Sequence, residues 1–295
     1  MVRTKRTQTR KIIRMTNILE AIANIYENRQ FQLVDIYQGR IRINGMGDAL
    51  ENYIKDAFAN SFAADTQQDR ITAFNREFSW LGVQNHPPDI IIKSGDAIEV
   101  KKTQSERGNL PLNSSYPKAD IRSDSPMITQ DCRDCEDWTI KDIIYAIGHT
   151  SDNTLKSLWF VYGSIYAAKH EVYQKVKTII SKGIQTIPNV EVASTREFSR
   201  VNRVDPLGIT NLRIRGMWEI KNPKRVYEHL HPRHNLTFEL VAIIPTEKYY
   251  SFPQPSKDKI NSINSEEFLI EDVQVQNPNN PAQLIDAKII KWLIQ

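Results

Sequence analysis

Hydrophobic and polar positions form their clearest pattern near residue 95, where two short apolar runs flank a polar turn. Residues 90–92 are a β-branched run, residues 94–96 are Ser-Gly-Asp, and residues 97–100 are again mostly apolar. This pattern predicts a β-hairpin. A three-residue loop at 94–96 would pair Asp89 with Lys101 and Ile91 with Glu99, whereas a two-residue loop would turn Asp89 to the opposite face.

The rest of the pattern predicts a mixture of helices and strands. Apolar spacing indicates helices at 18–26, with Thr16 as N-cap, and at 45–60, 169–182 and 282–294, and it indicates strands at 71–80, 157–163, 212–218 and 236–244. Residues 140–147 fit a short strand or a helix, and residues 61–70 and 104–126 fit loops. Because the two types mix without strict alternation, the sequence favours an α/β fold in which helices flank a mixed central sheet.

Two of the expected helices are amphipathic. The helix at 45–60 has an apolar stripe that includes Leu50 and Ile54, and Glu51 lies beside that stripe. The helix at 169–182 is expected to turn an apolar face inward, formed by Val172, Val176, Ile179 and Ile180.

Composition narrows the class of protein. The chain has 295 residues, of which 40% are hydrophobic and 25% charged, and this fits a soluble globular protein. No apolar run approaches the ~20 residues that span a bilayer. We therefore expect no membrane partner. Two cysteines cannot form a disulfide framework, so we expect a reducing, cytoplasmic location.

Positive charge is concentrated at the start of the chain. The net charge is +4, but residues 1–15 contain six basic residues, among them Arg3, Lys5 and Arg6, and no acidic one. Such an arm binds polyanions through counterion release, although it also fits a disordered, solubilising tail. We therefore expect a basic arm at 1–15 and a single domain at 16–295.

The hairpin carries the candidate chemistry. Because side chains alternate along a strand, Glu99 and Lys101 share one face, and the three-residue loop adds Asp89 to it. Two carboxylates and an ammonium at a sheet edge suit Mg²⁺, which binds oxygen ligands and a substrate phosphate. A surface hairpin with solvated charges is the alternative.

The spacing from Pro88-Asp89 to Glu99-x-Lys101 resembles the PD-(D/E)xK nuclease superfamily. Further segments are similar to the NgoPII-type family of type II restriction endonucleases. They are Met46 to Glu51, Gly82 to Gln104, Leu112 to Lys118, and Cys132-Arg133-Asp134-Cys135 followed by Trp138 and by Lys141 to Tyr145. This resemblance covers roughly residues 40 to 250.

The resemblance implies a bacterial restriction enzyme that cuts double-stranded DNA at a short GC-rich palindrome with Mg²⁺. Asp89, Glu99 and the Val100 carbonyl would hold the ion, Lys101 would position the attacking water, and Glu51 would support a second ion or a water. A palindromic site implies a homodimer. A DNA methyltransferase would be a functional partner without physical contact.

Two segments are candidates for reading DNA. The 113–122 loop offers Asn113, Ser114, Lys118 and Arg122, and the predicted strand at 212–218 places Arg213 and Arg215 on one face. An ordinary solvated strand face is an equally good interpretation of the two arginines.

Three other motifs are weaker candidates for a functional site. Glu219-x-Lys221 repeats the Glu-x-Lys pattern but lacks a hairpin partner, and Cys132-x-x-Cys135 favours a local turn packed on Trp138 over a zinc site. The histidines at 229, 231 and 234 favour a solvated or DNA-facing loop. Two other functions stay open at this point: a structure-specific repair or recombination nuclease of the same fold, and a non-catalytic DNA-binding protein.

Overall fold

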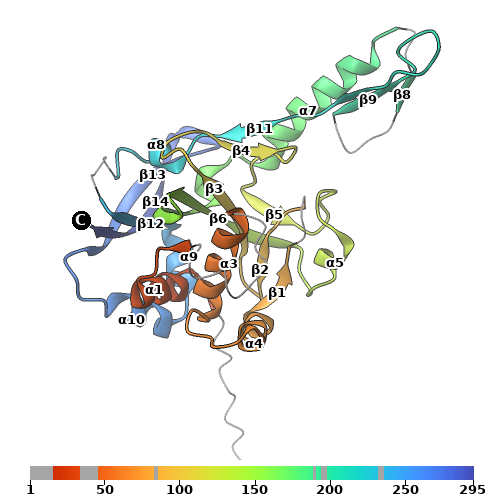
Figure 1. Cartoon of the computed structure of the whole chain (residues 1–295). Coiled ribbons are helices and arrows are strands. Elements are labelled where there is room, and N and C mark those ends of the chain that lie inside the picture. The colour runs from red at the N-terminus through yellow and green to blue at the C-terminus, as the bar shows by residue number, and fades with distance from the viewer. Residues whose placement is uncertain (1–15, 34–45, 83–85, 189–190, 194–197, 232–235) are drawn as a thin grey trace, which may run out of the picture.

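A computed structural model shows one large mixed sheet with helices packed around it (Figure 1). The structure describes residues 16–33, 46–82, 86–188, 191–193, 198–231 and 236–295. The strands follow the order β1-β2-β3-β6-β7-β12-β14-β13, and β5 also pairs with β6. The pairs β3–β6 and β7–β12 are parallel, and the other pairs of this sheet are antiparallel. The predicted mixed α/β fold is confirmed.

The strands of the large sheet are β1 (Phe78–Leu81), β2 (Ile90–Ile92), β3 (Ala97–Thr103), β5 (Asp120–Arg122), β6 (Ile140–Ser151), β7 (Thr154–Tyr162), β12 (Phe238–Pro245), β13 (Phe268–Asn277) and β14 (Asn280–Ile294). The helices are α1 (Ile18–Asn28), α3 (Met46–Ala59), α4 (Gln67–Glu77), α5 (Gln130–Arg133), α6 (Gly163–Tyr166), α7 (His170–Gln185), α8 (Pro223–Val226), α9 (Thr246–Ser251) and α10 (Gln254–Asn261). Among the described residues, no helix has both the length and the apolar character needed to cross a membrane.

The core lies where β6, β7 and β12 meet the packed helices. These central strands are buried on both faces, and Trp159 and Phe160 are among their largest buried side chains. Helix α3 packs against β3, and α1 packs against α3 and α10. The apolar stripe of α3, including Leu50 and Ile54, is buried as its spacing predicts.

The N-terminal helices differ from the prediction in two details. Asn17, and not Thr16, caps α1, because the Asn17 side chain accepts hydrogen bonds from the Leu19 and Glu20 N–H groups. Residues 67–77, expected as loop and strand, form α4, and the strand starts only at Phe78. Buried Arg70 explains the helix: it ion-pairs with Asp56 of α3 at 2.7 Å, a contact that local periodicity does not reveal.

The hairpin is present, but its register differs by two residues. Ile90 pairs with Ile98, and the loop is Lys93 to Gly95, so Asp89 lies opposite Glu99 and not opposite Lys101. Asp96 decides this register because its buried carboxylate accepts a hydrogen bond from Tyr162 at 2.7 Å. A shift of two preserves the face, so Asp89, Glu99 and Lys101 still share it.

The C-terminal segment is a strand and not the expected helix. Residues 280–294 form β14, which pairs along its length with β12 and β13. The segment from Pro253 to this strand, for which the pattern predicts mainly loops, contains α10 and β13. Apolar residues such as Ile289, Ile290 and Trp292 are buried between neighbouring strands, and this tertiary pairing outweighs their compatibility with a helix.

An arm projects from the body of the molecule, as Figure 1 shows. It comprises α7 and a three-stranded sheet of β8 (Glu191–Ala193), β9 (Ser199–Asn202) and β10 (Leu212–Ile214). At its base, β11 (Trp218–Ile220) pairs with β4 (Leu110–Asn113). The single strand expected at 212–218 is therefore two strands, because β10 pairs with β9 and β11 pairs with β4.

Candidate active site

Asp89, Glu99 and Lys101 lie together at the open end of the β2–β3 hairpin. Asp89 Oδ2 accepts a 2.6 Å hydrogen bond from the Val100 N–H, which ties the residue before β2 to β3. Lys101 Nζ forms an ion pair of 2.6 Å with Glu99 Oε1. The structure thus brings together the three side chains that strand alternation placed on one face.

The electrostatics of this cluster leave one carboxyl group only partly ionised near pH 7. Burial and the adjacent Glu99 carboxylate raise the pKa of Asp89 to about 7, against the opposing effects of Lys101 and the Val100 N–H. Burial alone would lower the pKa of Lys101, but the negative charges of Glu99 and Asp89 outweigh it and raise that pKa. The cluster therefore holds more negative charge than its single ammonium neutralises.

The donor set fits a divalent cation. Glu99 Oε2 is buried and has no hydrogen-bond partner among the described residues, an arrangement that costs free energy unless a cation satisfies it. Because the N–H and C=O of an extended residue point to the same strand edge, the Val100 carbonyl faces the Asp89 side. Across the described ranges, no three His, Cys, Asp or Glu side chains gather closely enough to hold a metal. The fitting set is thus two carboxylates and a backbone carbonyl, all oxygen.

The cluster opens into a pocket of about 430 Å³. Glu51 of α3 lines this pocket, as the resemblance implies, and forms an ion pair of 2.6 Å with Lys55. Asn113 and Ser114 line the same pocket. Asp48 is an additional acidic residue of the pocket, and its spacing of three from Glu51 on one helix is the signal that could have indicated it.

Lys118 and Arg122 line a different hollow of about 430 Å³, between β5 and the base of α7. The ammonium of Lys118 donates hydrogen bonds to Ser115 Oγ and to the Tyr116 carbonyl. Burial lowers the pKa of Lys118, although Glu99 opposes this shift. Lys118 also lines a small cavity together with Glu99, so it lies directly behind the cluster.

The two arginines of the predicted 212–218 strand do not line the pocket that holds Asp89. Arg213 lies in β10 of the arm, and Arg215 follows that strand. Arg3, Lys5 and Arg6 lie outside the residues that the structure describes.

The weaker motifs have structural roles. Glu219 is exposed and accepts a 2.8 Å hydrogen bond from Asn109, and it lies opposite Pro111 and no carboxylate. Trp138 Nε1 donates to the Cys132 carbonyl, as a local turn requires. His231 is buried against Glu239 at 2.9 Å, so the expectation of a solvated or DNA-facing loop is wrong for this residue.

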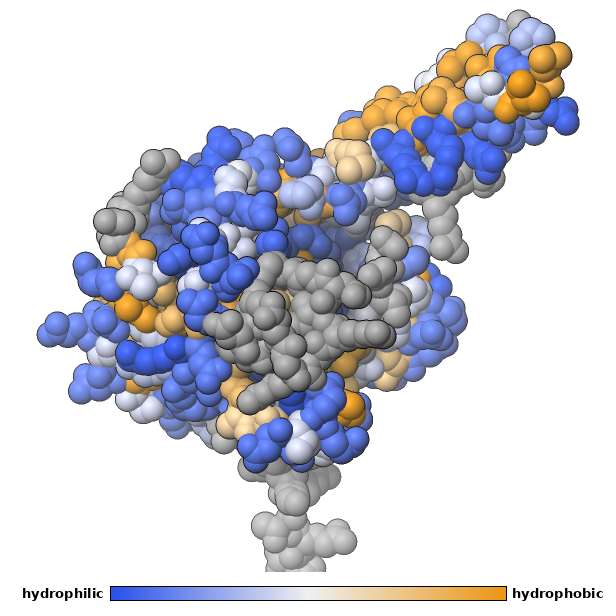
Figure 2. Space-filling model, in the orientation of Figure 1, coloured by the Kyte–Doolittle hydropathy of each residue, from blue (hydrophilic) through white to orange (hydrophobic). Residues whose placement is uncertain are grey.

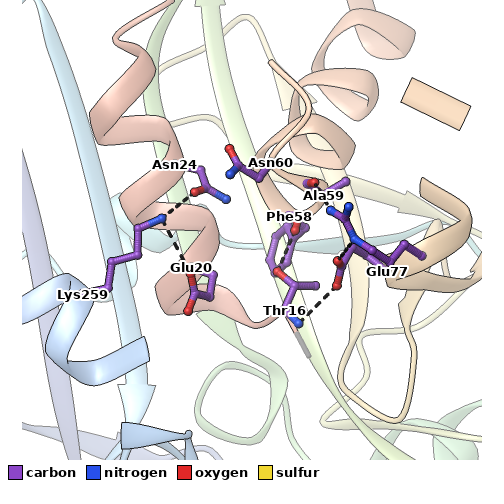
Figure 3. A pocket seen from close by; sticks show the side chains of 9 residues that line it. Thr16, Glu20, Asn24, Phe58, Ala59, Asn60, Glu77 and Lys259 are labelled. Carbon is purple, nitrogen blue, oxygen red and sulfur yellow. Dashed lines mark hydrogen bonds and ion pairs between the residues drawn. The ribbon is translucent and has the colours of Figure 1, made fainter. Parts of the chain in front are cut away.

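A further hollow, of about 300 Å³, lies between α1, α3 and α10 (Figure 3). Several of its polar groups pair with one another: Lys259 contacts Asn24 at 2.8 Å, and the Thr16 N–H contacts Glu77 at 3.3 Å. Because these groups already have hydrogen-bond partners, this hollow offers no donor or acceptor set comparable with the buried oxygen of Glu99.

The sequence is similar to known restriction endonucleases. The model of the family described as NgoPII restriction endonuclease matches residues 16–276. The type II restriction enzyme NgoPII of Neisseria gonorrhoeae is 43% identical over 278 residues, which make up 94% of this chain and 99% of that protein. No solved structure matches. The matched range contains the whole hairpin with Asp89, Glu99 and Lys101.

Proposed function

The chain belongs to the NgoPII restriction endonuclease family and is a type II site-specific deoxyribonuclease, and we propose that Asp89, Glu99 and Lys101 form its catalytic centre, of the PD-(D/E)xK kind. The observation that carries this proposal is the buried Glu99 Oε2 without a partner, beside Asp89 and Lys101 in one pocket.

Type II restriction endonucleases generally use a divalent metal, and we propose Mg²⁺ here, held by Asp89, Glu99 and the Val100 carbonyl. The bound ion would supply positive charge that stabilises the developing charge on the scissile phosphate. Lys101 would hold the attacking water in line with the phosphorus and help to take its proton. Glu51, which lines the same pocket, would hold a further water or a second ion.

The proposed substrate is a short GC-rich palindrome in double-stranded DNA, cut in both strands by a homodimer with one centre for each strand. Asn113 and Ser114, which line the pocket, would contact the DNA near the scissile bond. Lys118 and Arg122 are the next candidates along the chain. In the proposed bacterial restriction–modification system, the enzyme acts in the cytoplasm, and a methyltransferase of the same specificity protects the host DNA.

Plasmid digestion with hairpin variants tests this function. Discrete fragments are expected with Mg²⁺ and none with EDTA, and Asp89→Ala, Glu99→Ala and Lys101→Ala are each expected to lower the cleavage rate at least ~100-fold. Lys102→Ala is the matched control, because alternation turns Lys102 to the opposite face. Mg²⁺ should raise the melting temperature of the wild type but not of the Glu99→Ala variant. Full activity in any of the three variants would refute the assignment.

A further inference from the structure

Helix α7 carries an apolar face that the other described residues leave exposed. No residue of this 16-residue helix is buried, contrary to the expected inward face. The exposed fractions are 52% for Val172, 44% for Val176, 59% for Ile179 and 39% for Ile180. Figure 2 shows the result as a hydrophobic band along the arm. Exposed apolar surface of this length indicates an interaction site.

The other side of α7 is already in use. Tyr173 stacks on Tyr116, with ring centroids 5.5 Å apart, and packs edge-on against Trp218. The Ser181 hydroxyl donates to the Phe198 carbonyl. At 100° per residue, Ser181 lies opposite the apolar face and Tyr173 lies at its edge beside Ile180, so the rest of the face points outward.

We propose that this face, the α7 seam of Val172, Val176, Ile179, Ile180 and Gly183, is where two copies of the chain meet, with their α7 helices antiparallel about a two-fold axis. The proposal rests on the proposed function, because cleavage of both strands needs two catalytic pockets and the described residues of one chain form one such pocket.

The seam is complementary to itself in the antiparallel direction. Val176 of one copy would face Ile179 of the other, and Val172 would face Gly183. A side-chain atom added at Gly183 would meet nothing within 4 Å in the single chain, so this position offers open space for a partner's valine. Side-chain ridges of one α7 helix would then fit into the grooves of the other, which allows the two helices to pack closely.

Charge selects the same direction. Glu171 and Lys182 lie on the same flank of the seam, at opposite ends of the helix. In an antiparallel pair the same flanks meet, so Glu171 of each copy faces Lys182 of the other, whereas a parallel pair separates them. DNA is a poor occupant of this face, because phosphates gain nothing from contact with valine and isoleucine.

Sedimentation of the full-length enzyme over a range of concentrations tests the seam. Wild type is expected to be a dimer. Ile179→Asp should raise the dimer dissociation constant at least ~100-fold, because each of the two copies would bury an unpaired carboxylate in the interface. Gly183→Leu should also weaken the dimer while leaving the monomer folded. Gln174→Asp, which adds the same charge to an exposed position on the opposite side of α7, is the matched control and should leave the dimer intact.

Charge reversal tests the direction. Glu171→Lys and Lys182→Glu should each weaken the dimer several-fold, and the double variant should restore it. Each single reversal also opposes the dipole of α7 and so destabilises the helix itself. If this were the only cause of the weaker dimer, the two effects would add in the double variant and the dimer would not be restored. Restoration therefore supports antiparallel packing, and additive weakening overturns it.

Cleavage assays separate this inference from the proposed function. Ile179→Asp should cut slowly when dilute and recover at high protein concentration, whereas Lys101→Ala should remain dimeric and inactive at every concentration. A monomeric wild type, or dimer affinity unchanged by both Ile179→Asp and Gly183→Leu, overturns the seam alone. Reduced DNA affinity with an unchanged dimer would assign the face to DNA and also overturn it.

Discussion

Gly82 is the residue whose backbone most directly fixes Asp89. Its N–H donates a 2.6 Å hydrogen bond to the Asp89 carbonyl. A side-chain carbon at position 82 would lie 2.9 Å from Asp89 Cα and 2.8 Å from the Pro88 carbonyl oxygen, closer than real contacts allow. Only glycine permits this approach, so the position of Asp89 depends on a residue that makes no contact through a side chain.

Gly82→Ala is therefore expected to move Asp89 within an intact fold. The cleavage rate should fall at least ~10-fold, because displacements near 1 Å impair catalysis strongly, and unfolding should become easier by ~1–3 kcal/mol. Single-turnover cleavage and urea unfolding measure the two effects. A variant that cuts at the wild-type rate would show that Asp89 tolerates the shift.

At the scale of elements, a buried ionic network joins β7, β12 and α8. Glu239 of β12 accepts a 3.0 Å hydrogen bond from Trp159 of β7 and pairs with Lys224 of α8 at 2.7 Å and with His231 at 2.9 Å. Burial alone would raise the pKa of Glu239, but the His231 hydrogen bond and the Lys224 charge outweigh it and lower that pKa to about 2.

This network should make stability depend on acid pH. The folded-state pKa of Glu239 is about 2 against the ordinary 4.5, so its contribution is complete above about pH 4.5 and is lost as pH falls toward 2. Glu239→Gln should lower the free energy of unfolding by ~3 kcal/mol at pH 7 and by progressively less below pH 4.5. Urea unfolding at several pH values measures this.

The control for the acid effect is Glu228→Gln, because Glu228 is 52% exposed in its pair with Arg107 and should contribute at most ~1 kcal/mol at any pH. An equal loss at pH 7 and at pH 3 for Glu239→Gln would contradict the titration of this residue.

Residues at the end of β4 and in or next to β10 are expected to contribute differently to DNA recognition. Asn113 lines the catalytic pocket and has a φ of 52°, whereas Arg213 lies in the arm. Asn113→Gly removes the amide without backbone strain and should cost ~1–3 kcal/mol of cognate affinity, with a much smaller loss on random DNA. Arg213→Ala and Arg215→Ala should weaken both equally if they contact only phosphates.

Both affinities should be measured at one fixed salt concentration. A loss confined to cognate DNA in Arg213→Ala or Arg215→Ala would instead show that the arm reads guanines. An equal loss on both DNAs in Asn113→Gly would remove the pocket wall from the candidates for base recognition.

For the whole molecule, the basic segment at 1–15 is expected to add affinity without specificity. Deleting residues 1–11 should flatten the dependence of DNA binding on salt, because fewer counterions are released, and should leave the cleaved sequence unchanged. Filter binding from low to high salt and sequencing of fragment ends measure the two results. A changed cleavage site would show that this segment reads bases.

The sequence by itself determined what depends on neighbours along the chain. Alternation placed Glu99 and Lys101 on one face, and the spacing of Leu50 and Ile54 gave the buried side of α3. The resemblance of the Asp89 motif, together with segments such as Met46 to Glu51 and Leu112 to Lys118, indicated the family. The shared face and the buried side of α3 need only strand and helix periodicity, so they hold even though the expected hairpin register differs by two residues.

Tertiary structure decided what depends on distant partners. The hairpin register follows from the contact of Asp96 with Tyr162, and α4 depends on the ion pair of Arg70 with Asp56. The segment 280–294 is a strand because β12 and β13 lie on either side of it. Periodicity also gave α7 an apolar face but could not say what covers it. Such contacts arise only when segments far apart in sequence meet. The local pattern of apolar and polar residues does not specify which distant segments will meet.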